Sequence, residues 1–314
     1  MARHAFVFPG QGSQSVGMGL ELYKAFPVAR AVFEEVDEAL KVKLSHLIFE
    51  GDPAELRATE NTQPALFAVS MAAVRALEHE GGFALKDKAA LLAGHSLGEY
   101  AALTAAGVMS IAEGARLLRL RGQAMQRAVP VGQGGMAALL GVEPEVAQEI
   151  CTECSQGEVL EVANDNGGGQ IVISGHMDAI ERAMTAAKDR GIRRVVKLPV
   201  SAPFHSSLME PAAEEMQEAL ASAELHPASI PVIANVLAES VSQPDEIRNL
   251  LVKQITGRVR WRETVLSMPG KGVTCQHELG AGKVLTGLAR RIVPDLGADC
   301  AGTPAEIETM LKSL

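Results

Sequence analysis

The chain has 314 residues, of which 47% are hydrophobic and 21% charged, and a formal net charge of −9 at pH 7. The length suits about two domains. The acidic balance and an aromatic content of 4% argue against nucleic-acid binding. No apolar run reaches the ~18 residues of a membrane span. We see no secretory leader, and four cysteines are too few for a disulfide scaffold, so we expect a cytoplasmic protein with no membrane part.

Strands and helices alternate in the first 130 residues. Apolar runs predict strands at 5–8 and 89–93, and helical periodicity predicts helices at 28–40, 64–80, 97–107 and 111–129. Pro64 suits a first helical turn because its missing N–H is not needed there.

A Gly-rich segment at 131–135 then resembles a linker. It is followed by strand 136–142, helix 144–154, strands 159–164 and 170–174, helix 177–190 and strand 193–200. The order β-α-β-β-α-β is the ferredoxin-like pattern. We therefore expect an α/β fold with a ferredoxin-like subdomain at 131–201, inserted between the two parts of a larger subdomain at 1–130 and 202–314.

A Gly-x-Ser-x-Gly sequence, Gly94-His-Ser-Leu-Gly98, stands between a predicted strand and a predicted helix. There it predicts a nucleophile elbow, a sharp turn that needs glycine beside the serine because a Cβ would clash with backbone. The turn presents Ser96 at a helix N-terminus, where backbone N–H groups stabilise an oxyanion. The alternative is a tight turn that happens to contain serine.

A serine nucleophile needs a base, and His205 is the best candidate among eight histidines. It ends Pro199-Val-Ser-Ala-Pro-Phe-His205, a rigid extended segment of the kind that often carries catalytic residues. A helix-capping surface histidine is the alternative. His95 is adjacent to Ser96, but neighbours on an elbow point apart. Four others are expected at the surface: His4, His46, His79 and His226.

Arg121 lies on the apolar side of the helix predicted at 111–129, whereas Arg116, Arg119 and Arg127 fall on the polar side. A buried guanidinium needs an anion, because an unpaired buried charge is costly. The partner is either an internal Asp or Glu or the carboxylate of a substrate.

Three weaker patterns are set aside. Cys151-Thr-Glu-Cys154 falls late in a predicted helix, whereas a redox Cys-x-x-Cys begins one. The glycine-rich segment after Phe8 lacks both the dinucleotide fingerprint and a Walker lysine. Nowhere along the sequence do His, Cys, Asp and Glu follow metal-ligand spacing, so no metal site is expected.

Together these residues resemble the malonyl-CoA:acyl carrier protein transacylase family over essentially the whole chain. The resemblance rests on seven segments in the family's order: Phe8-Pro-Gly-Gln-Gly-Ser13, Thr62-Gln-Pro-Ala-Leu66, Gly94-His-Ser-Leu-Gly-Glu-Tyr-Ala-Ala102, Arg121-Gly122, Pro199-Val-Ser-Ala-Pro-Phe-His205, Gln254, and Glu278-Leu-Gly-Ala-Gly-Lys-Val-Leu285. The chain departs from the family at Ala281, where proline is usual, and at Cys275-Gln-His277, where hydrophobic residues are commoner.

The resemblance implies a hydrolase-like α/β core with a ferredoxin-like insertion. It implies that Ser96 is the nucleophile, that His205 is the base, and that the backbone carbonyl of Gln254 orients the imidazole. The backbone N–H groups of Gln11 and Leu97 would form the oxyanion hole.

It further implies that Arg121 holds the malonyl carboxylate. Phe204, beside the base, resembles the choice associated with malonyl over methylmalonyl units. The expected reaction moves malonyl from malonyl-CoA to acyl carrier protein through an ester on Ser96. It needs no cofactor, and the family suggests a monomer. The product would supply fatty acid or polyketide synthesis.

Three other functions stay open at this point. A serine hydrolase would need an acid between Ser96 and His205, such as Asp165 or Asp178. A transferase for another acyl group, or a non-catalytic acyl-binding protein, would also fit the elbow. A basic run could dock an acidic carrier protein, or it could be a solvated helix end: Lys188, Arg190, Arg193 and Arg194.

Overall fold

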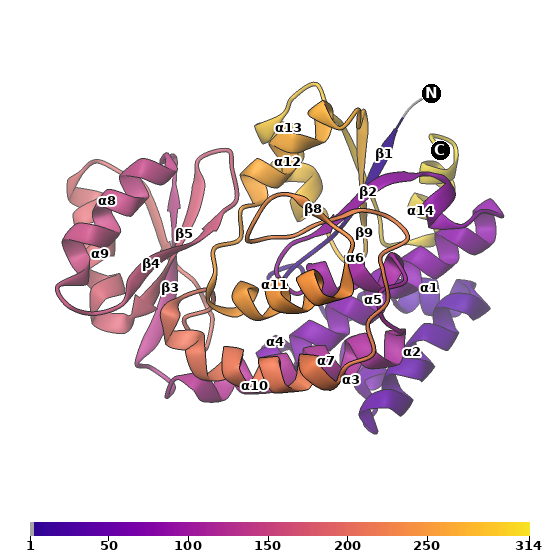
Figure 1. Ribbon diagram of the computed structural model, residues 1–314, viewed down its shortest axis with the longest axis horizontal. Helices are drawn as coiled ribbons and strands as arrows, with labels where there is room; N and C mark the ends of the chain where they lie inside the picture. The colour runs from indigo at the N-terminus through magenta and orange to yellow at the C-terminus, as the bar shows by residue number, and fades with distance from the viewer. Residues whose placement is uncertain (1–2) are drawn as a thin grey trace.

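The computed structural model describes residues 3–314 and has two sheets (Figure 1). The first part of the chain forms β1 (His4–Phe8), α1 (Leu20–Ala25), α2 (Pro27–Leu40), α3 (Leu44–Glu50), α4 (Pro53–Arg57), α5 (Thr59–Gly81), the 3₁₀ helix η1 (Leu85–Asp87), β2 (Ala89–Gly94), α6 (Gly98–Ala105) and α7 (Ile111–Ala128).

The middle part forms β3 (Gly134–Leu140), α8 (Pro144–Ser155), β4 (Leu160–Asp165), β5 (Gln170–His176), α9 (Met177–Asp189) and β6 (Arg194–Lys197). The last part forms the 3₁₀ helix η2 (Ser207–Met209), α10 (Glu210–Ser222), β7 (Val232–Ile233), β8 (Ser240–Val241), α11 (Pro244–Thr256), α12 (Trp261–Gly270), β9 (Cys275–Leu279), α13 (Val284–Ile292), β10 (Gly297–Ala301) and α14 (Pro304–Leu311).

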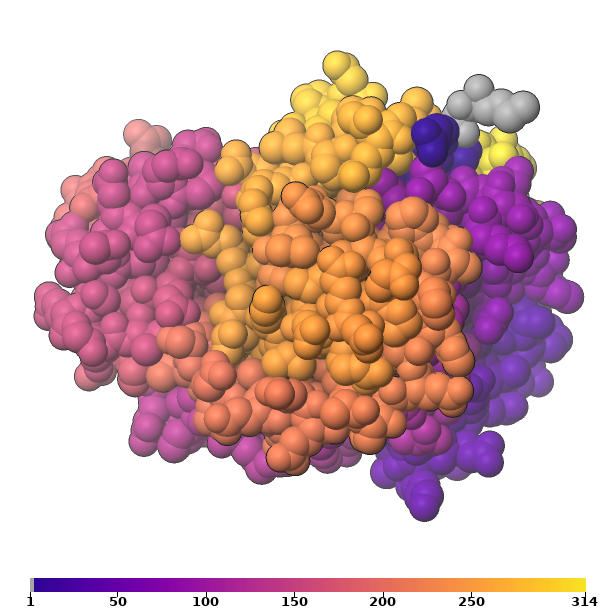
Figure 2. Space-filling view, in the orientation of Figure 1, coloured from indigo at the N-terminus to yellow at the C-terminus, as the bar shows by residue number. Residues whose placement is uncertain are grey.

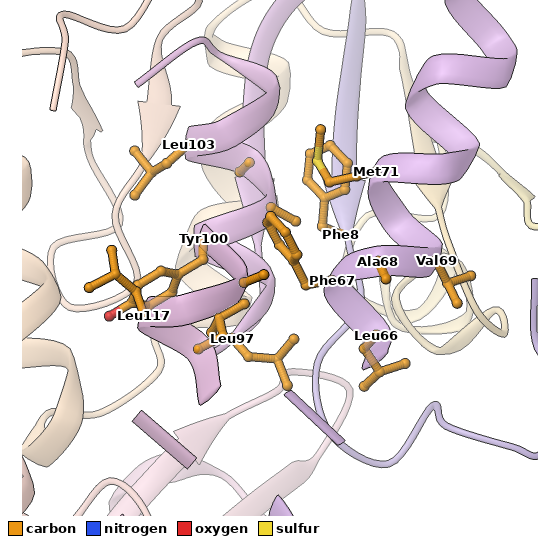
Figure 3. Close-up of a cluster of buried hydrophobic side chains, with 14 of the residues drawn as sticks. Phe8, Leu66, Phe67, Ala68, Val69, Met71, Leu97, Tyr100, Leu103 and Leu117 are labelled. Atoms are coloured by element: carbon orange, nitrogen blue, oxygen red, sulfur yellow. The ribbon is translucent and has the colours of Figure 1, made fainter. Parts of the chain in front are cut away.

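The larger sheet has the strand order β10-β9-β1-β2-β7-β8 and is parallel except for β8. Its central strands are short apolar runs, as expected of a parallel sheet covered on both faces. One face packs on α5 and α6, and the buried cluster there includes Phe8, Phe67, Met71 and Tyr100 (Figure 3). The other face packs around the buried Trp261 of α12.

The smaller sheet is antiparallel with the order β4-β5-β3-β6. With α8 and α9 on one side it is the ferredoxin-like arrangement, so the expected fold class is confirmed. Figure 2 shows this subdomain as a separate lobe beside the segment that carries α10 and α11. The boundaries at 131 and 201 stay a prediction; the sheet and its helices lie between Gly134 and Lys197.

The structure corrects the expected start of α5. The helix begins at Thr59, so Pro64 lies inside it rather than in its first turn. Proline cannot donate to the carbonyl four residues earlier, that of Glu60. Arg119 of α7 donates to this carbonyl instead, at 3.1 Å, which compensates for the missing helical bond. Tertiary contact, which no local pattern reveals, therefore permits the longer helix.

His4 is also corrected, since it is 4% exposed rather than a surface residue. It begins β1, which lies between β9 and β2 in the sheet. His46, His79 and His226 are exposed as expected. None of the helices in residues 3–314 has the length and apolar character needed to cross a membrane.

Candidate active site

The turn from β2 to α6 has the geometry expected of a nucleophile elbow. Ser96 has a φ of 53°, in the left-handed region that residues with a side chain rarely occupy. A Cβ on Gly94 would lie 1.9 Å from the carbonyl oxygen of Gly98, and one on Gly98 would lie 2.3 Å from that of Phe8. Both glycines are therefore required sterically, as expected of a turn this sharp.

Asn235 holds the strained turn in place. Its Oδ1 accepts the Ser96 N–H at 2.7 Å, and its Nδ2 donates to the Gly94 carbonyl at 2.7 Å. Asn235 was not predicted from the sequence as a site residue. Its signal is its position two residues after the short buried strand β7, at the carboxyl edge of the sheet where the elbow also lies.

Ser96 and His205 form a hydrogen-bonded pair, with Ser96 Oγ 2.8 Å from His205 Nε2. His205 is 4% exposed and, like Ser96, has a positive φ, of 56°. Its Nδ1 lies 2.8 Å from the Gln254 carbonyl oxygen and 3.1 Å from that of Gly257. Two carbonyl acceptors place the ring proton on Nδ1, which leaves the lone pair of Nε2 facing the serine hydroxyl.

No carboxylate of residues 3–314 is hydrogen-bonded to His205 in this arrangement. Asp165 lies between Ser96 and His205 in the sequence, but it binds Arg262 at 2.8 Å. Carbonyl oxygens occupy the position of the catalytic acid in hydrolases with a Ser-His-acid triad. Burial, followed by the charge of Arg121, lowers the pKa of His205 to about 3, so the imidazole is neutral at pH 7.

Arg121 projects from α7 to the serine and is 2% exposed. It donates to Gln63 Oε1 at 2.6 Å, to Gln254 Oε1 at 2.9 Å and to Ser96 Oγ at 3.2 Å. Its Nε has no partner in the part of the chain that the structure describes, and no Asp or Glu is hydrogen-bonded to the group there. The internal salt bridge that the sequence left open is therefore absent among residues 3–314.

Glu99 acts on Arg121 through its charge and forms no hydrogen bond with it among the described residues. Glu99 Oε2 accepts from the Asn235 N–H at 3.0 Å and from Gln254 Nε2 at 2.8 Å. Burial raises the pKa of Glu99 to about 7, although these hydrogen bonds and the charge of Arg121 oppose the shift. Glu99 therefore fixes the elbow's supports and leaves Arg121 only partly neutralised.

These groups line a cavity of about 330 Å³ between the two subdomains. Its walls include Gln11, Ser96, Leu97, Arg121, Phe204 and His205. The backbone N–H groups of Gln11 and Leu97 donate to no other group within residues 3–314. Both are thus free to bind an oxyanion beside the serine. Gln254 lies behind the imidazole and contributes its carbonyl there.

Sequence reasoning missed three supporting residues: Gln63, Glu99 and Asn235. Gln63 and Glu99 stood inside segments already noted for the resemblance. Their roles depend on contacts with α7 and α11, which bring residues more than 50 positions apart together.

The chain is also similar to known proteins over its length. The sequence pattern described as "Acyl transferase domain" matches residues 5–280. The chain belongs to this family. A malonyl CoA-acyl carrier protein transacylase of Bacillus subtilis is 42% identical, over all of this chain and 98% of the relative.

Solved structures agree as well. An acyl-carrier-protein-S-malonyltransferase of Bartonella henselae superimposes with a TM-score of 0.97 at 53% identity, covering 99% of each chain. A malonyl-transacylase solved in complex with its type II PKS acyl-carrier protein has a TM-score of 0.96 at 42% identity, covering both chains fully. The resemblance found in the sequence is confirmed.

The remaining sequence expectations have mixed outcomes. Cys151 and Cys154 are both buried near the end of α8, and burial raises the pKa of Cys151 to about 12, which does not suit a redox thiolate.

In the basic run, Arg190 forms ion pairs with Glu149 and Glu153, while Arg193 and Arg194 are exposed.

Proposed function

We propose that this acyltransferase moves malonyl from malonyl-CoA to the pantetheine thiol of acyl carrier protein through an ester on Ser96. The observation that carries the proposal is the pairing of Ser96 and His205 in a cavity with a buried Arg121 that has no carboxylate partner among the described residues. A buried guanidinium with a free N–H fits a substrate that brings its own carboxylate.

The first half of the cycle acylates the serine. His205 Nε2 takes the hydroxyl proton as Ser96 Oγ attacks the thioester carbonyl, and the Gln254 carbonyl stabilises the imidazolium through Nδ1–H. The N–H groups of Gln11 and Leu97 stabilise the oxyanion. When the intermediate collapses, the carbon–sulfur bond breaks, and the coenzyme A thiol leaves with the proton from His205.

The second half reverses these steps with the carrier thiol as nucleophile. His205 accepts the thiol proton, and the sulfur attacks the Ser96 ester. The serine oxygen then leaves and recovers the proton. Every group in this scheme is a side chain or backbone atom of the chain, so the reaction as proposed needs no cofactor. We place the enzyme in the cytoplasm, where its four free cysteines would remain reduced.

Phe204 is the proposed selectivity residue for the acyl chain. It lines the cavity directly beside the base. Its ring would crowd the α-methyl group of a methylmalonyl substrate. One extra methyl group in such a pocket changes the transition-state free energy by ~1–3 kcal/mol. We expect Phe204→Ser to raise kcat/KM for methylmalonyl-CoA relative to malonyl-CoA; an unchanged ratio would remove Phe204 from this role.

Arg193 and Arg194 are the proposed carrier contact, because both are exposed and neither forms an ion pair with the residues described. Reversing both charges should raise KM for acyl carrier protein and leave KM for malonyl-CoA unchanged. An equal rise in both constants would contradict this docking surface.

The decisive experiment for the function is intact-protein mass spectrometry. Brief exposure to malonyl-CoA should add one malonyl group to the wild type and to Ser13→Ala, but not to Ser96→Ala. Ser13 lines the same cavity and serves as the matched control. Addition of holo acyl carrier protein should move the group to the carrier. An adduct that decays to malonate regardless of carrier would indicate a thioesterase, and an adduct on Ser96→Ala would reject the nucleophile.

A further inference from the structure

A second cluster of reactive side chains lies at the end of the larger sheet that is opposite Ser96. Cys275 and His277 are two residues apart on β9, so their side chains share one face. Asp299 of β10 is the register partner of His277, and Gly297 is that of Cys275. The sulfur, an imidazole nitrogen and a carboxylate oxygen lie within 4.8 Å of one another.

The cluster has its own support on a third strand. His277 is fully buried and its Nδ1 lies 2.6 Å from Asp299 Oδ1. Its other nitrogen, Nε2, lies 2.8 Å from Nδ1 of His4 on β1. A histidine that binds a metal through one nitrogen needs a partner for the N–H of the other. His4 supplies that partner and fixes the plane of the ring.

The cluster also has space and access. The position facing Cys275 is Gly297, where a Cβ would come within 3.1 Å of the sulfur. Without that Cβ, the side of the sulfur toward β10 stays open. Asp299 is 39% exposed and β10 is the edge strand, so the carboxylate is free to move. A tetrahedral ion would separate Nδ1 and Oδ1 to ~3.3 Å, a small change from their present hydrogen bond.

We propose that Cys275, His277 and Asp299 bind one Zn²⁺ ion, with His4 orienting His277. Thiolate, imidazole and carboxylate together form a ligand set typical of zinc, whereas Mg²⁺ and Ca²⁺ prefer oxygen alone. Three protein ligands leave the fourth position to water. Zn²⁺ binding displaces the thiol proton of Cys275. With Nδ1 of His277 bound to the ion, the ring proton of His277 lies on Nε2 and forms a hydrogen bond to His4 Nδ1.

The proposed ion has a structural role that is separate from the transferase. Cys275 and His4 begin their strands, whereas Ser96 and Gln11 follow the carboxyl ends of β2 and β1. The ion would bridge β9 to β10 and, through His4, brace β1. The chain spacing of residues 4, 275, 277 and 299 hides the cluster from motif searches, because strand pairing alone assembles it.

The test uses the full chain after chelator treatment and dialysis. Isothermal titration should show one Zn²⁺ per chain, and Co²⁺ should give a thiolate charge-transfer band. Cys300→Ser is the matched control, because Cys300 is a partly buried thiol on β10, the strand that also carries Asp299. We expect wild-type affinity in Cys300→Ser, and affinity at least ~10-fold lower in Cys275→Ser and in His4→Ala.

Stability provides a second readout. A hundredfold excess of Zn²⁺ over Kd should raise Tm of the wild type and of Cys300→Ser by about 4 °C, with no rise for Cys275→Ser. If Cys275→Ser does not fold, Asp299→Asn takes its place, with the same loss expected. The proposal is overturned if the wild type binds no stoichiometric Zn²⁺, or if the ligand variants bind as tightly as Cys300→Ser.

Discussion

Replacing Arg121 with methionine should change which acyl donor the enzyme prefers. Methionine has a similar length but no charge, and the site then lacks the buried cation that would pair with a malonyl carboxylate. Two charge-assisted hydrogen bonds of ~1.5–3 kcal/mol each give a loss of ~3–6 kcal/mol. This corresponds to a fall of ~10²- to 10⁴-fold in kcat/KM for malonyl-CoA.

Acetyl-CoA separates this effect from general damage. Arg121 also donates to Ser96 and Gln254, so its loss can disturb the nucleophile for every donor. Acetyl-CoA has no carboxylate and reports that disturbance alone. We expect the malonyl-to-acetyl ratio of kcat/KM to fall at least ~10²-fold in Arg121→Met, and to stay constant in Arg116→Met, on the exposed side of α7. Equal losses for both donors would refute the carboxylate clamp.

Four further outcomes are expected. Because the pKa of His205 is lowered to about 3, kcat/KM should change little between pH 7.5 and pH 5. With a base of pKa 6.5, kcat/KM would fall about 30-fold over this range. A fall of that size would contradict a neutral buried base. The unfolded chain protonates this histidine near pH 6.5 and the native one does not, so its contribution to stability is lost as pH falls from about 6.5 toward 3, which unfolding midpoints at several pH values will check. Gly98→Ala should abolish acylation because its Cβ would lie 2.3 Å from the Phe8 carbonyl oxygen, and an acylated Gly98→Ala would refute this steric argument. Gly287 lies in open space on α13, so Gly287→Ala should raise the free energy of unfolding by ~0.5–1 kcal/mol. An unchanged or lower denaturation midpoint would refute this expected stabilisation.

Local signals predicted the parts of the site that local chemistry determines. The elbow needs two glycines within five residues, so its signature is continuous in the sequence. The burial of Arg121 followed from helical periodicity over α7 alone. The ferredoxin-like subdomain was also predictable, because all of its strands and helices come from one continuous stretch of the chain, between Gly134 and Lys197.

The features that the sequence did not reveal depend on pairing across long distances. His4 is buried because β9, some 270 residues later, pairs beside β1. Asn235 contacts the elbow 139 positions away, and neither residue encodes that register locally. Likewise, the extension of α5 before Pro64 depends on a donor from α7. Periodicity identifies faces of helices and strands, but it does not say which faces meet.

The charge of Arg121 couples substrate binding to the strength of the base. In the free site it is the second cause, after burial, of the lowered pKa of His205. A malonyl carboxylate would neutralise that charge and raise the pKa of His205, which makes the imidazole a better proton acceptor when the correct donor is bound. We expect NMR titration of the His205 ring in Ser96→Ala to show a higher pKa with malonyl-CoA than with acetyl-CoA. Arg121→Met should remove the difference, and an equal pKa with both donors would show that the carboxylate does not reach Arg121.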